Sequence, residues 1–141
     1  MELNVKAAYF TAQMVARNMI DSDIAGSIIN VSSQMGHVGA QGRTVYCASK
    51  HAIEGFTRAL AWEVGEHGIR VNTLCPTFIE TPMTRPMLAD AEVMEQVLSK
   101  IALGRVGTVE DIMGAVVYLA SDASQLVTGS ALLVDGGGTA N

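Results

Sequence analysis

The sequence contains few cysteines and no long apolar run, and these absences exclude several classes of protein. Its two cysteines, Cys47 and Cys75, have neither the spacing of a metal site nor the number that a disulfide framework needs. Their apolar neighbours favour reduced, buried thiols and a cytoplasmic location. No apolar segment is long enough to cross a bilayer, and the first residues lack the pattern of a signal peptide. We therefore expect no metal site and no membrane partner.

Positive charge is also scarce, because nine Lys and Arg residues stand against fourteen Asp and Glu, giving a formal net charge of −5. A nucleic-acid surface needs clustered basic residues, so we expect no nucleic-acid partner. The sequence shows no internal repeat, low-complexity tract or Pro-rich linker, so residues 1–141 are treated as one domain. Its 49% hydrophobic content is enough for one sizeable core.

Helical and strand patterns alternate along the chain. Helices are expected over 3–20, 44–66 and 90–102, with further helix starts at Thr81-Pro82 and at Thr108. Strands are expected over 27–33, 69–75 and 131–134. Strands separated by helices predict right-handed crossovers and a parallel sheet. Because parallel strands are normally covered on both faces, three of them indicate one side of a larger, doubly wound α/β sheet.

Two of these helices allow more detailed expectations. Gly68 follows the long helix at the position where glycine commonly ends one. The core face of this helix is expected to carry Ile53, Phe56, Leu60 and Val64. The helix at 3–20 is apolar on more than one side, so it is expected to pack over much of its surface.

Tyr46 and Lys50 lie four residues apart, so a helix would present their phenol and ammonium groups to one pocket. A free phenol has a pKa of about 10, and a neighbouring ammonium favours the phenolate, which suits general acid–base work. Ser33 ends a predicted strand at the carboxyl edge of the sheet, where open α/β folds bind ligands. Its hydroxyl could hold a substrate oxygen; a helix cap or turn is the alternative, and Ser32 competes for either role. His37 is interpreted as an exposed loop histidine.

Ser33, Tyr46 and Lys50 at this spacing, within Ile28 to Ser33 and Tyr46 to Lys50, resemble the short-chain dehydrogenase/reductase family. Further segments are similar to motifs of that family in the same order: Leu3-Asn-Val5, Gly68-Ile-Arg-Val-Asn72, Val127-Thr-Gly129 and Val134-Asp-Gly-Gly137. The resemblance extends across the whole chain. It implies the C-terminal part of a Rossmann-like fold, and hydride transfer between NAD or NADP and a small-molecule carbonyl or secondary alcohol.

The resemblance also implies roles for particular residues. Tyr46 would exchange a proton with the substrate oxygen, and Ser33 would orient that oxygen. Lys50 would favour the phenolate of the tyrosine and hydrogen-bond the nicotinamide ribose. Asn4 would hold a water in a proton relay to Lys50, and a polar side chain bonded to helix backbone is its alternative.

The loop after the second strand resembles the family's nicotinamide loop. The residues expected to bind the cofactor are Tyr46, Lys50, Pro76, Thr77, Ile79 and Thr81. Thr77 departs from the family's usual Pro-Gly, which would cost backbone freedom at that turn. Residues 82–102 correspond to a variable substrate lid, whose methionines either line a pocket or pack the helices.

The sequence lacks the glycine-rich dinucleotide fingerprint and the acidic residue that follows it. Residues 1–141 are therefore expected to form a single partial Rossmann-like domain that carries the catalytic residues and the nicotinamide end of the site. A fragment of a longer enzyme is favoured over a short subunit that completes its site with a partner. The alternative function is a truncated, non-catalytic fragment or subunit acting only through oligomer contacts. Because the family pairs subunits through its two long helices and last strand, a homo-oligomer, either dimer or tetramer, is expected.

Overall fold

Three parallel strands form the centre of the fold, in a computed structural model that describes residues 1–140. The strands are β1 (Gly26–Val31), β2 (Ile69–Pro76) and β3 (Ala131–Val134), and they lie in the order β1-β2-β3. Both pairings are parallel; Gly26 lies opposite Ile69, and Thr73 lies opposite Ala131. The predicted α/β class and parallel sheet are confirmed, with strand bounds close to those expected.

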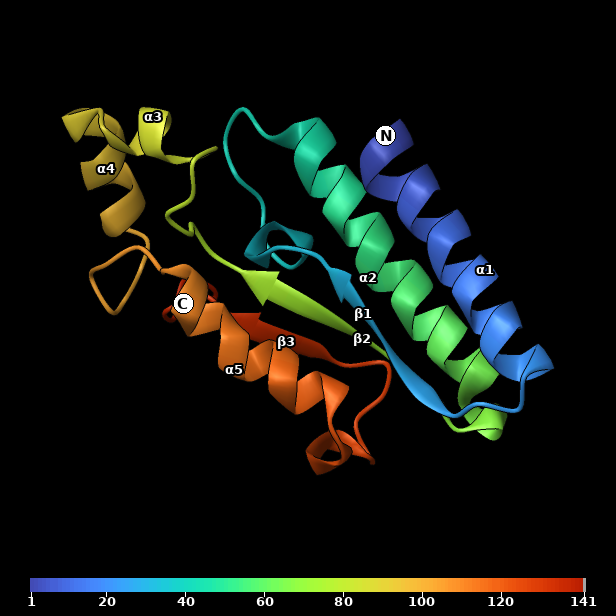
Figure 1. Cartoon of the computed structure of the whole chain (residues 1–141). Helices are drawn as coiled ribbons and strands as arrows, with labels where there is room; N and C mark the ends of the chain where they lie inside the picture. Colours follow the sequence, from blue (N-terminus) through green and yellow to red (C-terminus); the bar gives the residue numbers. More distant parts are fainter. Residues whose placement is uncertain (141) are drawn as a thin grey trace.

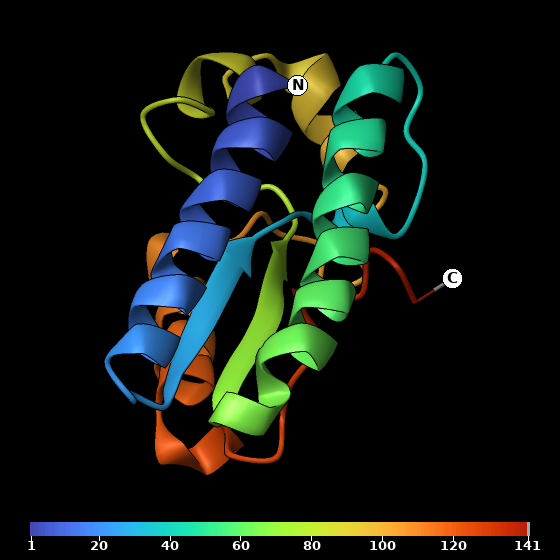
Figure 2. The same cartoon turned by 90° about the vertical axis from the view of Figure 1, so that its right-hand side faces the viewer.

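Helices cover both faces of this sheet (Figure 1). Helices α1 (Ala8–Asp21) and α2 (Thr44–Val64) lie side by side on one face, and α5 (Val109–Ala120) lies on the other (Figures 1 and 2). The short helices α3 (Arg85–Leu88) and α4 (Ala91–Leu98) lie beyond the carboxyl ends of the strands. These three layers leave the carboxyl edge of the sheet facing the loops that follow β1 and β2.

The main core lies between the sheet and the pair of helices α1 and α2. Its buried members are small or branched side chains: Ala12, Ala16, Ile28, Ala61, Val64, Ile69 and Val71. Each fully buried Ile or Val side chain among them contributes about 1.5–3 kcal/mol to folding. A second cluster of Leu88, Val97 and Ile101 holds α3, α4 and the following turn together. The segment between β2 and α5 therefore has a small core of its own.

The ends of α2 and α5 follow the sequence closely. A 3₁₀ turn over Gly65–His67 follows α2 and ends at Gly68, whose φ of +71° lies in the left-handed region that glycine adopts without strain. The helix start predicted at Thr108 is also confirmed: α5 opens with a capping box, in which the Thr108 amide donates to Asp111 Oδ2 at 2.8 Å. On α2, Ile53 is buried as predicted.

The first helix differs from the expectation. A π-helical segment over Glu2–Ala7 runs directly into α1, and only Ala12 and Ala16 of α1 are buried. Leu3 is 81% exposed and Met14 is 66% exposed. Within residues 1–140 this helix therefore packs over only part of its surface, and packing of the remainder stays a prediction. In that part of the chain, no helix combines the length and the apolar character needed to pass through a bilayer.

The segment after β2 also differs. Thr81-Pro82 does not begin a helix, because Thr84 Oγ1 donates to the Ile79 carbonyl at 2.6 Å and accepts from the Thr81 amide at 2.9 Å. These bonds fold the chain into a turn, and α3 begins only at Arg85. The helix expected over 90–102 begins at Ala91 as α4, capped by Asp90, but ends earlier, at Leu98.

Candidate active site

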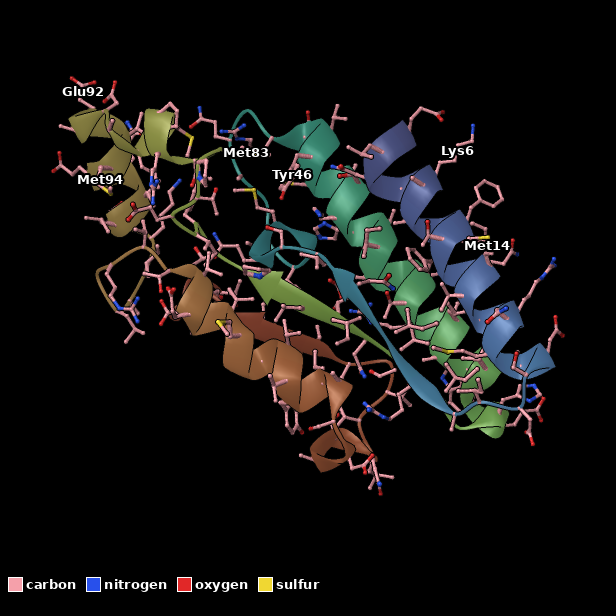
Figure 3. The ribbon with its side chains drawn as sticks, in the orientation of Figure 1. Lys6, Met14, Tyr46, Met83, Glu92 and Met94 are labelled. Atoms are coloured by element: carbon pink, nitrogen blue, oxygen red, sulfur yellow. The ribbon has the colours of Figure 1, made fainter. Side chains whose placement is uncertain are left out.

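Three polar side chains form a column on α2. Tyr46, Lys50 and Glu54 follow one another at four-residue steps, which places them on the same helix face. Their exposure decreases along the column: Tyr46 is 38% exposed, Lys50 is half-buried, and Glu54 is 3% exposed. Figure 3 shows Tyr46 at the N-terminal end of α2, near the carboxyl edge of the sheet. The helix thus presents a phenol at the surface of the site and a carboxylate in its interior.

Lys50 connects the tyrosine to the sheet. Its Nζ donates a hydrogen bond to the Val31 carbonyl at 3.1 Å and lies 5.7 Å from the centroid of the Tyr46 ring. An ammonium at that distance is attracted to an aromatic ring. Burial lowers the pKa of Lys50, and the neighbouring Cys75 and Glu54 act in the opposite direction. The phenol and ammonium share one region, and their catalytic roles remain predictions.

Ser33 lies just beyond the end of β1 and is buried. Its Oγ accepts a hydrogen bond from the Met35 amide at 3.2 Å, so it caps the 3₁₀ turn Gln34–Gly36. This is the cap that the sequence offered as an alternative role. The cap uses the hydroxyl as an acceptor and leaves its proton to donate elsewhere. Capping and substrate binding are therefore compatible in one side chain.

Asn4 contacts α2 next to the predicted catalytic residues. Its Nδ2 donates to Ser49 Oγ at 3.3 Å, and Ser49 Oγ donates to the Tyr46 carbonyl at 2.7 Å. Asn4 is thus linked, through one buried serine, to the backbone of the residue that carries the phenol. Its predicted part in a proton relay to Lys50 remains a prediction.

Ser33 and Tyr46 line one cavity of about 540 Å³. This volume suits a small ligand or the reactive end of a larger one. Within residues 1–140, three buried polar atoms have no hydrogen-bond partner: Ser32 Oγ, Gln34 Oε1 and Thr77 Oγ1. All three residues line this same cavity. Since buried polar groups are normally hydrogen-bonded, their concentration here is typical of a ligand site.

The four residues of the predicted nicotinamide loop line this cavity as well: Pro76, Thr77, Ile79 and Thr81. Thr77 donates its amide to the Val134 carbonyl at 3.2 Å, in continuation of the sheet. Its φ is not positive, because Asp23 alone has a positive φ among the non-glycine residues of the described chain. Thr77 therefore occupies this turn without left-handed backbone strain, and the expected loss of backbone freedom stays a prediction. Cofactor binding by the four residues stays a prediction.

His37 is not the exposed loop residue that the sequence suggested. Its side chain is 22% exposed, and its Nε2 lies 3.5 Å from both Glu54 Oε1 and Cys75 Sγ. Cys75 is buried, as predicted, and its thiol donates to Glu54 Oε1 at 3.3 Å. Burial of the thiol raises the pKa of Cys75 to about 12. No sequence spacing signals this cluster, because its members come from a loop, a helix and a strand.

Arg43 is a site residue that the sequence reasoning missed. It is the residue preceding α2 and lines the cavity with Tyr46. Helical spacing does not signal it, because Arg43 stands before α2 with a non-helical backbone. Arg43 stands three positions before the tyrosine on which the whole prediction rested.

Several known proteins are similar to this chain in sequence and in fold. A family model described as enoyl-(acyl carrier protein) reductase matches residues 1–139. L-xylulose reductase from Caenorhabditis elegans is 42% identical over 135 residues, which cover 96% of this chain and 54% of that protein. Gluconate 5-dehydrogenase from Burkholderia cenocepacia, solved with NADP and tartrate, is 34% identical with a TM-score of 0.95; the match covers 100% of this chain and 55% of that one. The 4-hydroxyisoleucine dehydrogenase solved with NADH is 35% identical with a TM-score of 0.95; the match covers 99% of this chain and 58% of that one.

The chain spans about half the length of the curated relatives it matches. The match itself runs over nearly the whole chain, in both sequence and structure. The relatives are reductases and dehydrogenases, and solved neighbours carry NADP or NADH. By sequence and by fold, this chain belongs to the short-chain dehydrogenase/reductase family.

Proposed function

We propose that this chain carries the catalytic part of an NAD(P)-dependent oxidoreductase, which interconverts a carbonyl and a secondary alcohol. The observation that carries the proposal is the composition of one cavity. Its lining includes Ser33 and Tyr46, which carry hydroxyls, and three residues whose buried side-chain atoms lack partners within residues 1–140. Such atoms are destabilising unless a ligand satisfies them.

The residues around the cavity fit a nicotinamide. Thr77 Oγ1 is one of the unpartnered atoms, and Thr77, Ile79 and Thr81 would hold the carboxamide. Pro76 would shape the turn beneath it, and Lys50 and Tyr46 would hydrogen-bond the ribose. When bound, the nicotinamide supplies or accepts the hydride at the substrate carbon.

The proton follows a separate route through the chain's own residues. In the reductive direction Tyr46 Oη gives its proton to the substrate oxygen, so that a carbonyl becomes a hydroxyl. Ser33 Oγ donates a hydrogen bond to the same oxygen and fixes its position. The ammonium of Lys50, 5.7 Å from the ring, stabilises the phenolate that remains. Asn4 supports this end of α2 through Ser49.

A small-molecule substrate and a homo-oligomer complete the proposal. The relatives named above act, by name, on xylulose, gluconate and hydroxyisoleucine, which are small hydroxylated molecules. An oligomer is supported by the apolar surface of α1 and the segment before it, where Leu3, Phe10 and Met14 are exposed. Figure 3 shows Met14 on the outer side of α1. Both cysteines are free, which supports a cytoplasmic location.

The same apolar surface favours the second candidate, a non-catalytic subunit that acts through oligomer contacts alone. Tyr46→Phe separates the two candidates, with Tyr118→Phe as a matched control, because both tyrosines are 38% exposed. The purified chain is titrated with NADH and NADPH by calorimetry and assayed with a panel of ketoses and oxo acids. Cofactor binding, with turnover lost only in Tyr46→Phe, supports the enzyme. A folded chain that binds neither cofactor and turns over nothing favours the subunit.

A further inference from the structure

The cavity at Tyr46 contains a single charged side chain. Apart from Arg43, its lining consists of uncharged residues, and no Asp or Glu of the described chain contributes to it. The sequence as a whole carries a net charge of −5, so the cavity has the opposite sign to the protein. A charged side chain that lines a concave, mostly apolar site raises the local concentration of ligands that carry the opposite charge. The cavity is therefore suited to an anion.

The guanidinium of Arg43 is free to bind such an anion. Arg85 pairs with Glu80 at 3.0 Å, and Arg105 pairs with Asp111 at 2.7 Å. By contrast, no ion pair within residues 1–140 involves Arg43. A guanidinium offers donors in a planar fork that matches the two oxygens of a carboxylate. One arginine also balances one negative charge, whereas a phosphate group carries nearly two.

Arg43 and Tyr46 are close in the sequence and line the same cavity. Arg43 precedes Tyr46 by three residues and stands directly before the first residue of α2. Both residues line the same cavity, and Arg43 also lines a neighbouring one of about 370 Å³. One small molecule in this cavity of about 540 Å³ can therefore contact both residues, with an anionic group at Arg43 and a carbonyl at Tyr46.

We propose that Arg43 binds the carboxylate of a small hydroxy acid or oxo acid and so determines the substrate class of this site. The inference rests on the proposed function, because Tyr46 must act on the same molecule. In reduction, the hydride of NAD(P)H forms the new C–H bond and Tyr46 protonates the oxygen, while the carboxylate stays unchanged at Arg43. A neutral polyol or ketose binds more weakly, since it leaves the guanidinium without its charged partner.

The first test measures binding and does not require turnover. The ¹⁵N-labelled chain, with and without NADP⁺, is titrated with lactate, meso-tartrate and D-gluconate, each paired with its neutral counterpart: propane-1,2-diol, erythritol and D-glucitol. We expect at least one acid to shift the Arg43 side-chain NMR signal and to bind about tenfold or more tightly than its polyol. Arg43→Gln should abolish the preference, while Arg58→Gln, an exposed arginine farther along α2, should keep it. Equal binding of every pair, or an unchanged preference in Arg43→Gln, overturns the inference.

The second test separates failure of this inference from failure of the proposed function. Steady-state rates are measured for oxo acids of three to six carbons and for their amides. We expect Arg43→Gln to reduce kcat/KM about tenfold or more for the acids and to leave the amides nearly unchanged. Arg43→Lys should recover part of the loss, because it restores the charge without the planar fork. If turnover exists but Arg43→Gln affects acids and amides equally, the substrate class is wrong and the enzyme stands. If Tyr46→Phe leaves turnover intact, the proposed function itself is wrong.

Discussion

The thiol of Cys75 and the carboxylate of Glu54 meet inside the protein, with Sγ 3.3 Å from Oε1. Glu54 also accepts a hydrogen bond from Thr73 Oγ1 at 2.9 Å. Both donors lie on β2, whereas Glu54 lies on α2. The helix that carries Tyr46 and Lys50 is therefore joined to the central strand by buried hydrogen bonds as well as by apolar contacts.

This junction predicts a loss of stability in Glu54→Ala of about 3 kcal/mol, because the Thr73 hydroxyl and the Cys75 thiol would be left buried without an acceptor. Glu54→Gln keeps one acceptor oxygen and should lose about 1 kcal/mol. Urea denaturation measures both changes. Glu63→Ala, at an exposed position on the same helix, is the control and should stay within about 0.5 kcal/mol of the unmodified chain. Similar losses in Glu54→Ala and Glu63→Ala would contradict the structural role of this network.

Because the pKa of Cys75 is raised, we expect the folded protein to lose stability at alkaline pH. Burial raises the pKa of its thiol to about 12, whereas the thiol of an unfolded chain has a pKa of about 8.5. Above the unfolded value the folded chain binds more protons, so this contribution is complete below about pH 8.5 and declines as pH rises toward 12. Urea midpoints between about pH 7.5 and 10 should fall less steeply in Cys75→Ala than in the unmodified chain. Cys47→Ala is the control and should keep the slope; a Cys75→Ala slope as steep as the original would refute the assignment.

Because the pKa of Asp135 is lowered, we expect the folded protein to lose stability at acid pH. Burial opposes ionisation of its carboxyl, but hydrogen bonds from Thr139 and from the Gly137 amide outweigh burial and lower the pKa of Asp135. A depressed pKa contributes stability that is present above the unfolded value of about 3.9 and is lost as pH falls through the folded value. Asp135→Asn should therefore be less stable than the unmodified chain at pH 7 and approach it below about pH 3. Thermal unfolding across this range measures the difference, which a constant gap at every pH would contradict.

The contact between Asn4 and Ser49 predicts coupling between two distant parts of the sequence. Ser49→Ala should lower the free energy of unfolding by about 1 kcal/mol, because it removes the bond to the Tyr46 carbonyl and the acceptor of Asn4. Asn4→Ala should cost less in the Ser49→Ala background than in the unmodified chain, with a coupling energy of about 0.5 kcal/mol or more. A double-mutant cycle in urea measures it. Strict additivity would show that the first helical segment is not held through this contact.

The sequence predicted best those elements whose determinants are local. Gly68 ends its helix through its own left-handed backbone, and Thr108 caps α5 through a residue three positions away. The strand Ala131–Val134 was also placed correctly, since it lies between glycine-containing turns. In each case the signal and the structure it specifies lie within a few residues of each other.

The errors arose where distant residues decide the outcome. His37 reads as a loop residue, but Glu54 and Cys75 draw it inward from other elements. Thr81-Pro82 has the composition of a helix start, yet Thr84 bonds back to Ile79 and delays the helix to Arg85. The column of Tyr46 and Lys50 followed from helical periodicity, whereas the three unpartnered cavity atoms could be found only in the folded structure.

Strand β1 pairs with β2 alone among residues 1–140, so its other edge has no strand beside it. Residues 27–31 of that strand carry no charge and no proline, and three of the five are β-branched. Open edges of this composition recruit further strands from other molecules. When residues 1–141 stand alone in concentrated solution, we therefore expect a loss of monomer through edge-to-edge association.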